Sequence, residues 1–191
     1  MIADLEKLVN KFIGVLVFPF KITLTDNTWD ISHREGLTGI IAFTKWSTPQ
    51  KKAFYKCEDL TFIVGVCPTL GSDMRYMFAG ASNFNQPLND WDVSSVTNMS
   101  WMFSGASSFN QPLNEWDVSS VTNMWRMFVG TSSFNQPLND WDVSSVTDMD
   151  RMFSEASNFN QPLNDWDVSS VTNMDRMFNE SNVVKLPEWY R

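Results

Sequence analysis

Hydrophobic and polar residues follow a 25-residue period through the second half of the chain. The motif FNQPLN[D/E]WDVSSVT[N/D]M, followed two residues later by MF, begins at Phe84, Phe109, Phe134 and Phe159. A fixed period in this range predicts a solenoid, in which each unit packs only on its neighbours and the stacked units share one core. Such folds mostly present long binding surfaces.

The first part of each repeat predicts a β-strand. The stretch Asp90–Val93 alternates acidic and apolar residues, which gives one apolar and one acidic face. When repeats stack, equivalent strands are expected to pair in a parallel sheet, with one tryptophan per repeat pointing inward. The expected tryptophan column contains Trp91, Trp116, Trp141 and Trp166. Asn85 and its equivalents are expected to form a polar ladder.

The second part of each repeat predicts a short α-helix. Ser94 and Thr97 are capping residues, and the apolar residues of Met99–Ala106 recur at i, i+3, i+4 and i+7. Pro112 then prevents the helix from continuing and turns the chain back. The predicted fold class is therefore α/β, a β/α solenoid with a parallel sheet, short helices and an N-terminal cap.

The pattern W-x-V-x-x-V-T-x-M-x-x-M-F-x-x-A-x-x-F, from Asp73 to Ser181, resembles the BspA-like leucine-rich-repeat surface proteins, in particular their mycoplasma-type 25-residue repeats. The segment Ala53–Leu60 is similar to the AFxxCxxL form of the same repeat. It suggests a degenerate repeat over Leu37–Leu60, with the next strand within Phe62–Val66. The resemblance implies a leucine-rich-repeat-type solenoid, a cell-surface or extracellular location, and a role in adhesion or host contact. It implies no catalytic residues and no cofactor.

The chain divides into three expected parts: an N-terminal cap at 1–28, degenerate repeats at 29–72, and regular repeats with a short C-terminal end at 73–191. The apolar residues of Ile2–Phe12 share one helical face, which predicts a capping helix followed by a strand. The apolar run Phe12–Phe20 is shorter than the roughly 20 residues that cross a bilayer. It follows Asp4 and Glu6 rather than a basic segment, so we interpret it as core and not as a signal peptide.

The charge of the chain narrows the classes of partner. The net charge is −8, and Phe84–Val183 holds 13 acidic residues against three arginines, a balance of −10. This argues against nucleic acid and favours a protein partner with a cationic surface. Cys57 and Cys67 give neither a disulfide framework nor a zinc motif. With the single histidine, His33, outside the repeats, we expect no enzyme, cofactor or resident metal.

The acidic residues of the repeats are the main candidates for partner binding. They are expected to project from the exposed, concave face of the sheet, where stacked carboxylates repel one another. The candidates are Asp90, Asp92, Glu115, Asp117, Asp140, Asp142, Asp165 and Asp167. Alternatives are specific calcium binding, a sheet face that resists aggregation, and hydrogen bonds to the serines that follow.

Two further sets of residues are candidates for contact. Trp101 and Trp125 occupy variable positions on the outer side of the expected helix and are candidate partner anchors, although neutral variation also explains them. The methionine pairs of the repeats are interpreted as core filler rather than as copper ligands.

At the C-terminal end, Val184, Leu186 and Trp189 are candidates for self-association, because Trp166 is expected to lack a neighbour there. A head-to-tail filament is therefore the alternative to a binding module.

Overall fold

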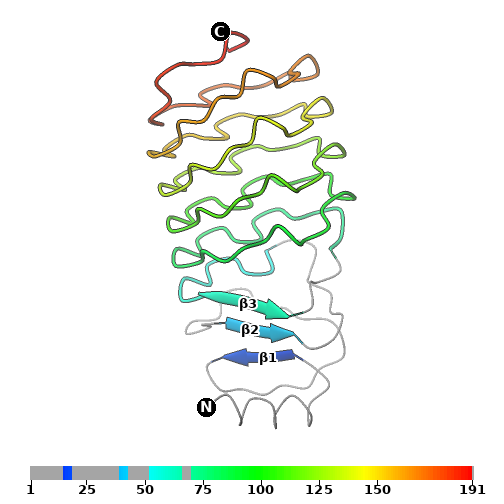
Figure 1. The fold of residues 1–191 in the computed structure, drawn as a ribbon, viewed down its shortest axis with the longest axis vertical. Coiled ribbons are helices and arrows are strands. Elements are labelled where there is room, and N and C mark those ends of the chain that lie inside the picture. The colour runs from blue at the N-terminus through cyan, green and yellow to red at the C-terminus, as the bar shows by residue number, and fades with distance from the viewer. Residues whose placement is uncertain (1–14, 19–38, 43–51, 66–69, 191) are drawn as a thin grey trace.

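The repeats stack as successive coils along one axis, with the C-terminal residues at one end of the stack (Figure 1). The computed structural model describes residues 15–18, 39–42, 52–65 and 70–190. Three short strands precede the coils: β1 (Val15–Phe18), β2 (Gly39–Ala42) and β3 (Phe62–Gly65). They form one sheet in the order β1-β2-β3, in which β1 and β2 are antiparallel and β2 and β3 are parallel.

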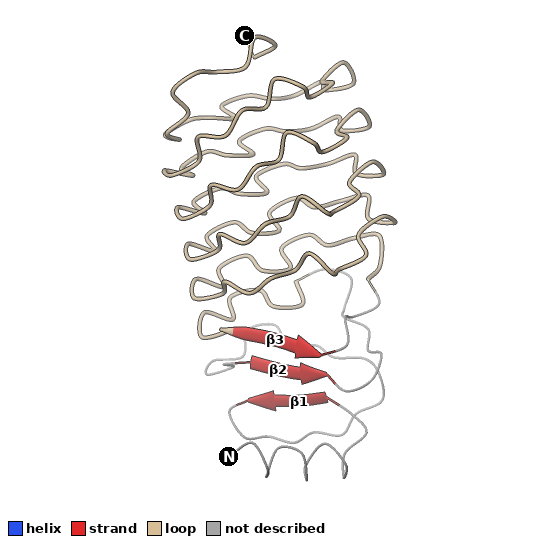
Figure 2. Ribbon diagram, viewed as in Figure 1, coloured by secondary structure: helices blue, strands red, loops and turns tan. Residues whose placement is uncertain are grey.

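The predicted α/β class is wrong. The described residues contain no helix, and their strands end at β3, before the first regular repeat, so the coils are drawn as loops and turns (Figure 2). The part of the chain that the structure describes is therefore not a β/α solenoid with a parallel sheet and short helices. The strand expected within Phe62–Val66 is confirmed as β3, and β1 lies within Phe12–Phe20. The capping helix at Ile2–Phe12, His33 and most of the N-terminal 51 residues lie outside the described residues.

The expected helix is replaced by consecutive turns because its backbone donors are divided between two coils. Met102, Ser104 and Ala106 donate their N–H groups to the carbonyl three residues earlier, as in β-turns. The residues between them donate to the next coil instead, as from Phe103 to the carbonyl oxygen of Met127 at 2.9 Å. An α-helix uses these donors within its own segment. Bonding to the neighbouring coil therefore excludes the helix.

The backbone of this turn segment alternates in handedness. Trp101 and Gly105 have φ of 60° and 71°, and equivalent residues of the other coils are also left-handed. A helix made of L-amino acids cannot contain such residues without strain. The spacing of the apolar residues therefore predicted the correct buried positions but the wrong backbone.

The expected parallel sheet is reduced to one bridge per coil. In the stretch predicted as a strand, Trp91 donates its N–H to the carbonyl oxygen of Leu88 at 3.0 Å, which closes a turn. Among the described regular coils, parallel pairing is limited to one residue per coil, the residue that precedes the first methionine of each M-x-x-M pair. These isolated bridges join Asp73, Asn98, Asn123, Asp148 and Asn173 in sequence.

The inward tryptophan column is confirmed. Trp91, Trp116, Trp141 and Trp166 are no more than 6% exposed. Each of the last three donates its indole N–H to a leucine carbonyl 28 residues earlier; for Trp141 the acceptor is Leu113, at 3.0 Å. These three tryptophans thus both fill the core and tie their coils to the preceding ones.

Two columns of phenylalanine complete the core. Phe78, Phe103, Phe128, Phe153 and Phe178 stack with centroids 5.5–5.9 Å apart and planes within 6°. A second column contains Phe84, Phe109, Phe134 and Phe159. Nine of the ten paired methionines are fully or almost fully buried beside them, which confirms their interpretation as core filler.

The predicted asparagine ladder is present, and it bonds to the backbone. The side-chain oxygen of Asn85 accepts the backbone N–H of Asn110 at 2.9 Å and a second hydrogen bond from the amide of Gln111 at 3.0 Å. The same pair of bonds recurs from coil to coil up to Asn160. The motif NQP therefore fixes the register of one side of the stack.

Candidate interaction surfaces

The eight predicted acidic residues, here called the acidic strip, are all exposed. In the first three repeats the tryptophan between each acidic pair and the valine after it are buried. The alternation read from Asp90–Val93 is therefore correct. The expected concave sheet is not, because the strip lies on turns rather than on strands. One residue of the strip precedes each buried tryptophan and one follows it, so every coil contributes two carboxylates.

The second carboxylate of each coil is fixed by the serine two residues later. Asp92 accepts the hydroxyl of Ser94 at 2.6 Å and its backbone N–H at 3.1 Å. These bonds, the hydroxyl first, hold the pKa of Asp92 below its ordinary value. The pKa values of the equivalent residues are lowered for the same reason; these are Asp117, Asp142 and Asp167.

Successive carboxylates of this column act on one another. The charges of Asp117 and Asp167 raise the pKa of Asp142, against the larger lowering by Ser144. The repulsion expected from the sequence is thus present, and the hydrogen bonds to serine, one of the alternatives, are present as well. Asp92, Asp117, Asp142 and Asp167 have no ion-pair partner among the described residues. Their charge is therefore directed to solvent.

Trp101 and Trp125 lie in a second surface feature, the aromatic column formed by Tyr55, Tyr76, Trp101 and Trp125. Each ring contacts the next, with Trp101 stacked on Tyr76 at 5.6 Å and edge-on to Trp125 at 5.6 Å. Both tryptophans are half-buried. The structure therefore places them on the outer side of a coil, as expected, but partly covered by each other rather than as free anchors.

Arginine side chains lie beside the aromatic column. The guanidinium of Arg126 lies 4.6 Å from the ring centre of Trp101 and 5.4 Å from that of Trp125. The indole N–H of Trp125 donates to Asp150 at 2.8 Å, and Asp150 pairs with Arg151 at 3.3 Å. Arg126, Arg151 and Arg176 also line a cavity of about 450 Å³ together with Glu155 and Glu180. Sequence reasoning missed this grouping, although the 25-residue spacing of the arginines was its signal.

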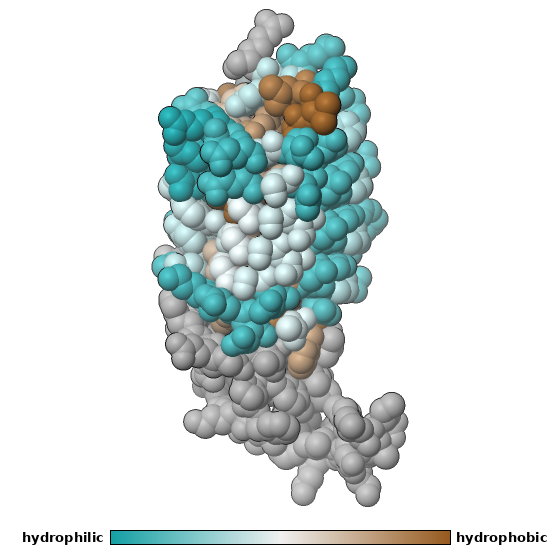
Figure 3. Space-filling view, turned by 90° about the vertical axis from the view of Figure 1, so that its left-hand side faces the viewer, coloured by the Kyte–Doolittle hydropathy of each residue, from teal (hydrophilic) through white to brown (hydrophobic). Residues whose placement is uncertain are grey.

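The C-terminal end differs from the prediction. Trp189 lies 6.2 Å from Trp166 with their planes 9° apart, and it donates to the carbonyl oxygen of Leu163 at 2.9 Å. Trp166 therefore has its neighbour, and the reason given for self-association at this tryptophan is wrong. Val184 is 82% exposed and Leu186 46% exposed. Hydrophobic residues gather at this end of the surface (Figure 3).

Two features are absent from the described residues. No group of three histidine, cysteine or acidic side chains lies close enough to hold a metal ion in the part of the chain that the structure describes. No helix within the same residues is long and apolar enough to cross a membrane.

Comparison with known proteins gives one match. The family model described as "Mycoplasma protein of unknown function, DUF285" matches residues 72–189, more than half of the chain. The matched range begins just before the first bridge residue, Asp73, and ends at Trp189. No curated protein and no solved structure matches the chain.

Proposed function

The chain belongs to the DUF285 family of mycoplasma proteins of unknown function, and on this premise we propose that it is a non-enzymatic interaction module that binds a cationic protein surface through its acidic strip. The observation that carries the proposal is the regular presentation of two exposed carboxylates by each of four coils. The resemblance of the repeats to BspA-like surface proteins supports a location at the cell surface or outside the cell, and a role in adhesion.

The electrostatics of the strip favour a cationic partner. Stacked carboxylates repel one another, and the repulsion is relieved when lysine or arginine side chains lie against them. The serine bonds keep the second column ionised even in mild acid, because they lower the pKa of each aspartate. A charged surface of this kind accelerates encounter with its partner and makes binding depend on salt.

The regular spacing favours a partner with several positive charges. Equivalent carboxylates recur once per coil, so a basic segment that lies along the stack meets a new pair of charges at every coil. Each single contact at an exposed site is weak, on the order of 1 kcal/mol or less. Binding along four coils adds such contacts without a second ordering cost, which is the advantage of a multivalent site.

Two variants of equal net charge test the proposal. One changes the second column of the acidic strip to asparagine at positions 92, 117, 142 and 167. The matched control changes four acidic residues outside the strip: Glu155→Gln, Asp175→Asn, Glu180→Gln and Glu188→Gln. The probe is a fluorescent oligolysine peptide, and its affinity is measured by anisotropy at low and physiological salt.

The strip variant is expected to bind the probe at least tenfold more weakly and with a flatter salt dependence, while the control keeps most of the parent's affinity. Equal losses in the two variants would show that only net charge matters, and would overturn the strip as a site. Binding of intact cells or of purified surface proteins, compared between the same variants, then tests adhesion itself.

A further inference from the structure

Each coil donates four backbone hydrogen bonds to the coil that follows it. From the coil that begins at Met74 to the coil that begins at Met149, alternate N–H groups reach carbonyl oxygens 24 residues later, at 2.7–3.1 Å. The last coil departs from this rule. Its four equivalent N–H groups have no acceptor among the described residues; they belong to Met174, Arg176, Phe178 and Glu180. We call residues 174–180 the open edge.

Other groups beside the open edge are also uncovered. The carbonyl oxygen of Thr147 accepts both the N–H and the hydroxyl of Thr172, at 2.8 and 3.0 Å. The carbonyl oxygen of Thr172 receives no such bonds within the described part of the chain. Val168 and Val171 are half-buried, whereas their equivalents in the three preceding coils are at most 1% exposed. Each earlier coil buries this surface against the coil that follows it. On the last coil, no described residue covers the same surface.

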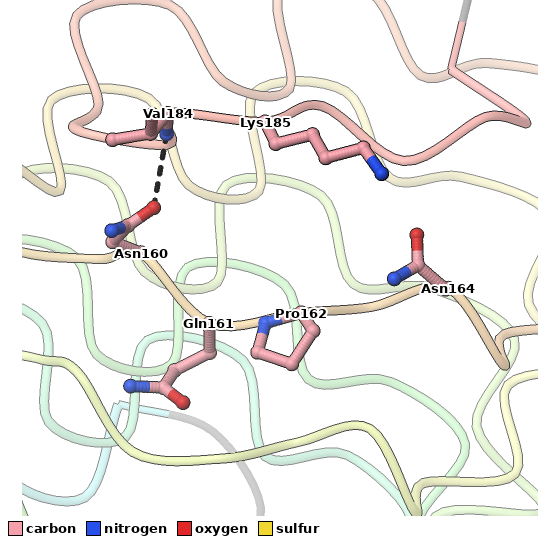
Figure 4. Close-up of a pocket in the computed structure, with 6 residues that line it drawn as sticks. All are labelled: Asn160, Gln161, Pro162, Asn164, Val184 and Lys185. Carbon is pink, nitrogen blue, oxygen red and sulfur yellow. Dashed lines mark hydrogen bonds between the residues drawn. The ribbon is translucent and has the colours of Figure 1, made fainter.

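The C-terminal tail covers the other half of the last coil. Val184 donates its N–H to the side-chain oxygen of Asn160 at 2.9 Å, the bond that Asn160 itself makes to the coil before (Figure 4). Trp189 takes the place of the next core tryptophan. The described tail thus reproduces the first half of a coil. A cleft of about 330 Å³, lined by Phe178, Leu186 and five other residues, remains between the tail and the open edge.

The four free N–H groups define what fits the open edge. They need carbonyl oxygens at alternate residues, and the uncovered valines need apolar side chains. A second folded copy does not supply the carbonyls, because those of the described regular coils, from Asn98 onward, are already bonded to the coil before. Two open edges placed against each other would bring donor against donor.

We propose that the open edge binds a peptide segment of another polypeptide that has the chemistry of this chain's own turn segment. The segment adds to the stack as half a coil: its alternate carbonyls accept the four N–H groups, and its valine, methionine and phenylalanine cover the last coil. This mode is the counterpart, for stacked turns, of strand addition at a sheet edge. It does not depend on the acidic strip, so either proposal can fail alone.

The probe that tests this proposal is a synthetic peptide with the sequence Val146–Asn158, which contains the threonine, both methionines and the phenylalanine of one coil. Binding is measured by anisotropy, and amide hydrogen exchange is followed by NMR. In the free protein, the amides of residues 174, 176, 178 and 180 are expected to exchange much faster than those of residues 149, 151, 153 and 155. The peptide is expected to slow the first set at least tenfold.

Three controls distinguish specific binding at the open edge from non-specific association. A scrambled peptide of the same composition, and a peptide of Phe134–Trp141 that matches the half already covered by the tail, are expected not to bind. Val171→Asp is expected to weaken binding at least tenfold, whereas Val184→Asp, on the covered half, leaves it unchanged. Hydrogen exchange at residues 99–105 reports whether each variant is folded.

Several results would overturn the proposal. These are slow exchange at the four amides without peptide, binding that leaves them fast, equal binding of the scrambled peptide, and no binding at millimolar concentration. Protection that grows with the concentration of the protein alone would assign the edge to a second copy instead. That outcome is checked by sedimentation on the same samples.

Discussion

Trp189 occupies, beside Trp166, the position that the next coil's tryptophan would take. The two rings lie 6.2 Å apart and nearly parallel, and Trp189 donates to the carbonyl oxygen of Leu163 as Trp166 does to that of Leu138. The tail therefore extends the tryptophan column by one ring.

Removal of this ring is expected to destabilise the last coils. Trp189→Ala uncovers Trp166 and removes the indole hydrogen bond to the carbonyl oxygen of Leu163. Because Trp189 is only half-buried, the loss is expected to fall below the roughly 3–5 kcal/mol of a fully buried tryptophan. Urea denaturation gives the free energy, with Val184→Asp as a surface control that changes it by less than about 0.5 kcal/mol. Equal stability of both variants would mean that the tail does not cap the stack.

In the middle of the stack, Trp141→Ala is expected to cost about 3–5 kcal/mol. The side chain is 4% exposed, and its indole N–H bonds to Leu113 at 3.0 Å. Trp141→Phe keeps most of the buried surface and removes the hydrogen bond, so its loss should be smaller. Unfolding curves of the two variants measure the free energy lost with the buried surface and the free energy lost with the hydrogen bond. Coincident melts of Trp141→Ala and the parent protein would contradict the buried column.

The left-handed turn position offers a pair of opposite substitutions. Gly130 has φ of 65°, and Glu155, its equivalent one coil later, has φ of 61°. Gly130→Ala meets no steric clash, since the nearest atoms lie 4.0 Å from the added carbon, but a side chain at this φ is expected to cost about 1 kcal/mol. Glu155→Gly removes that strain, and the greater backbone entropy of glycine reduces the gain to less than about 1 kcal/mol. Shifts of the same sign in thermal melts would contradict this account.

The acidic strip predicts a specific loss of stability in acid. Hydrogen bonds from serine lower the pKa of Asp92 in the folded state from its ordinary value of 3.8. A carboxyl group with a lowered folded-state pKa stabilises the fold above 3.8, and this contribution is lost as the pH falls below 3.8 through the folded pKa. The melting temperature of the parent protein should therefore fall more steeply toward about pH 3 than that of the variant with asparagine at positions 92, 117, 142 and 167.

At neutral pH the same variant is expected to melt slightly lower than the parent, because the serine hydrogen bonds to the ionised aspartates outweigh the repulsion between neighbouring aspartates. Asparagine keeps an acceptor for the serine, as Asn98 does for the N–H and hydroxyl of Ser100 at 3.0 and 2.8 Å. Parallel pH profiles for variant and parent would contradict the assigned role of the serine bonds.

The sequence predicted which side chains are buried better than it predicted the backbone that carries them. Alternation around Trp91 and the spacing of Met99, Met102 and Phe103 identified core residues correctly. The same spacing implied a helix, because i, i+3, i+4 also describes turns that follow one another every few residues. The hydrogen bonds decide between the two, and half of the donors in this segment bond to the next coil. A hydrophobic pattern does not contain that information.

The surface features likewise divide into those that the sequence predicted and those that it did not. Exposure of the acidic strip followed from its place between buried residues, and the serine bonds, which lie within one coil, were among the alternatives. The partial burial of Trp101, by contrast, depends on a neighbouring coil. The uncovered surface was expected at Trp166 and lies instead at residues 174–180, because Val184 bonds to Asn160 and Trp189 bonds to the carbonyl oxygen of Leu163. Only the full set of backbone hydrogen bonds shows that residues 174–180 are the uncovered ones.

Because the inter-coil hydrogen bonds of the asparagines, core tryptophans and threonines recur after 25 residues, the length of this protein is adjustable in whole units. Deletion of residues 109–133 would join the coil of Phe84 directly to the coil of Phe134, and each asparagine, tryptophan and threonine would find an equivalent partner. Loss of 24 or 26 residues would instead place every downstream side chain out of register. Duplication or loss of single repeats in the gene would therefore change the length of the stack without changing its fold. Natural selection can act on that length.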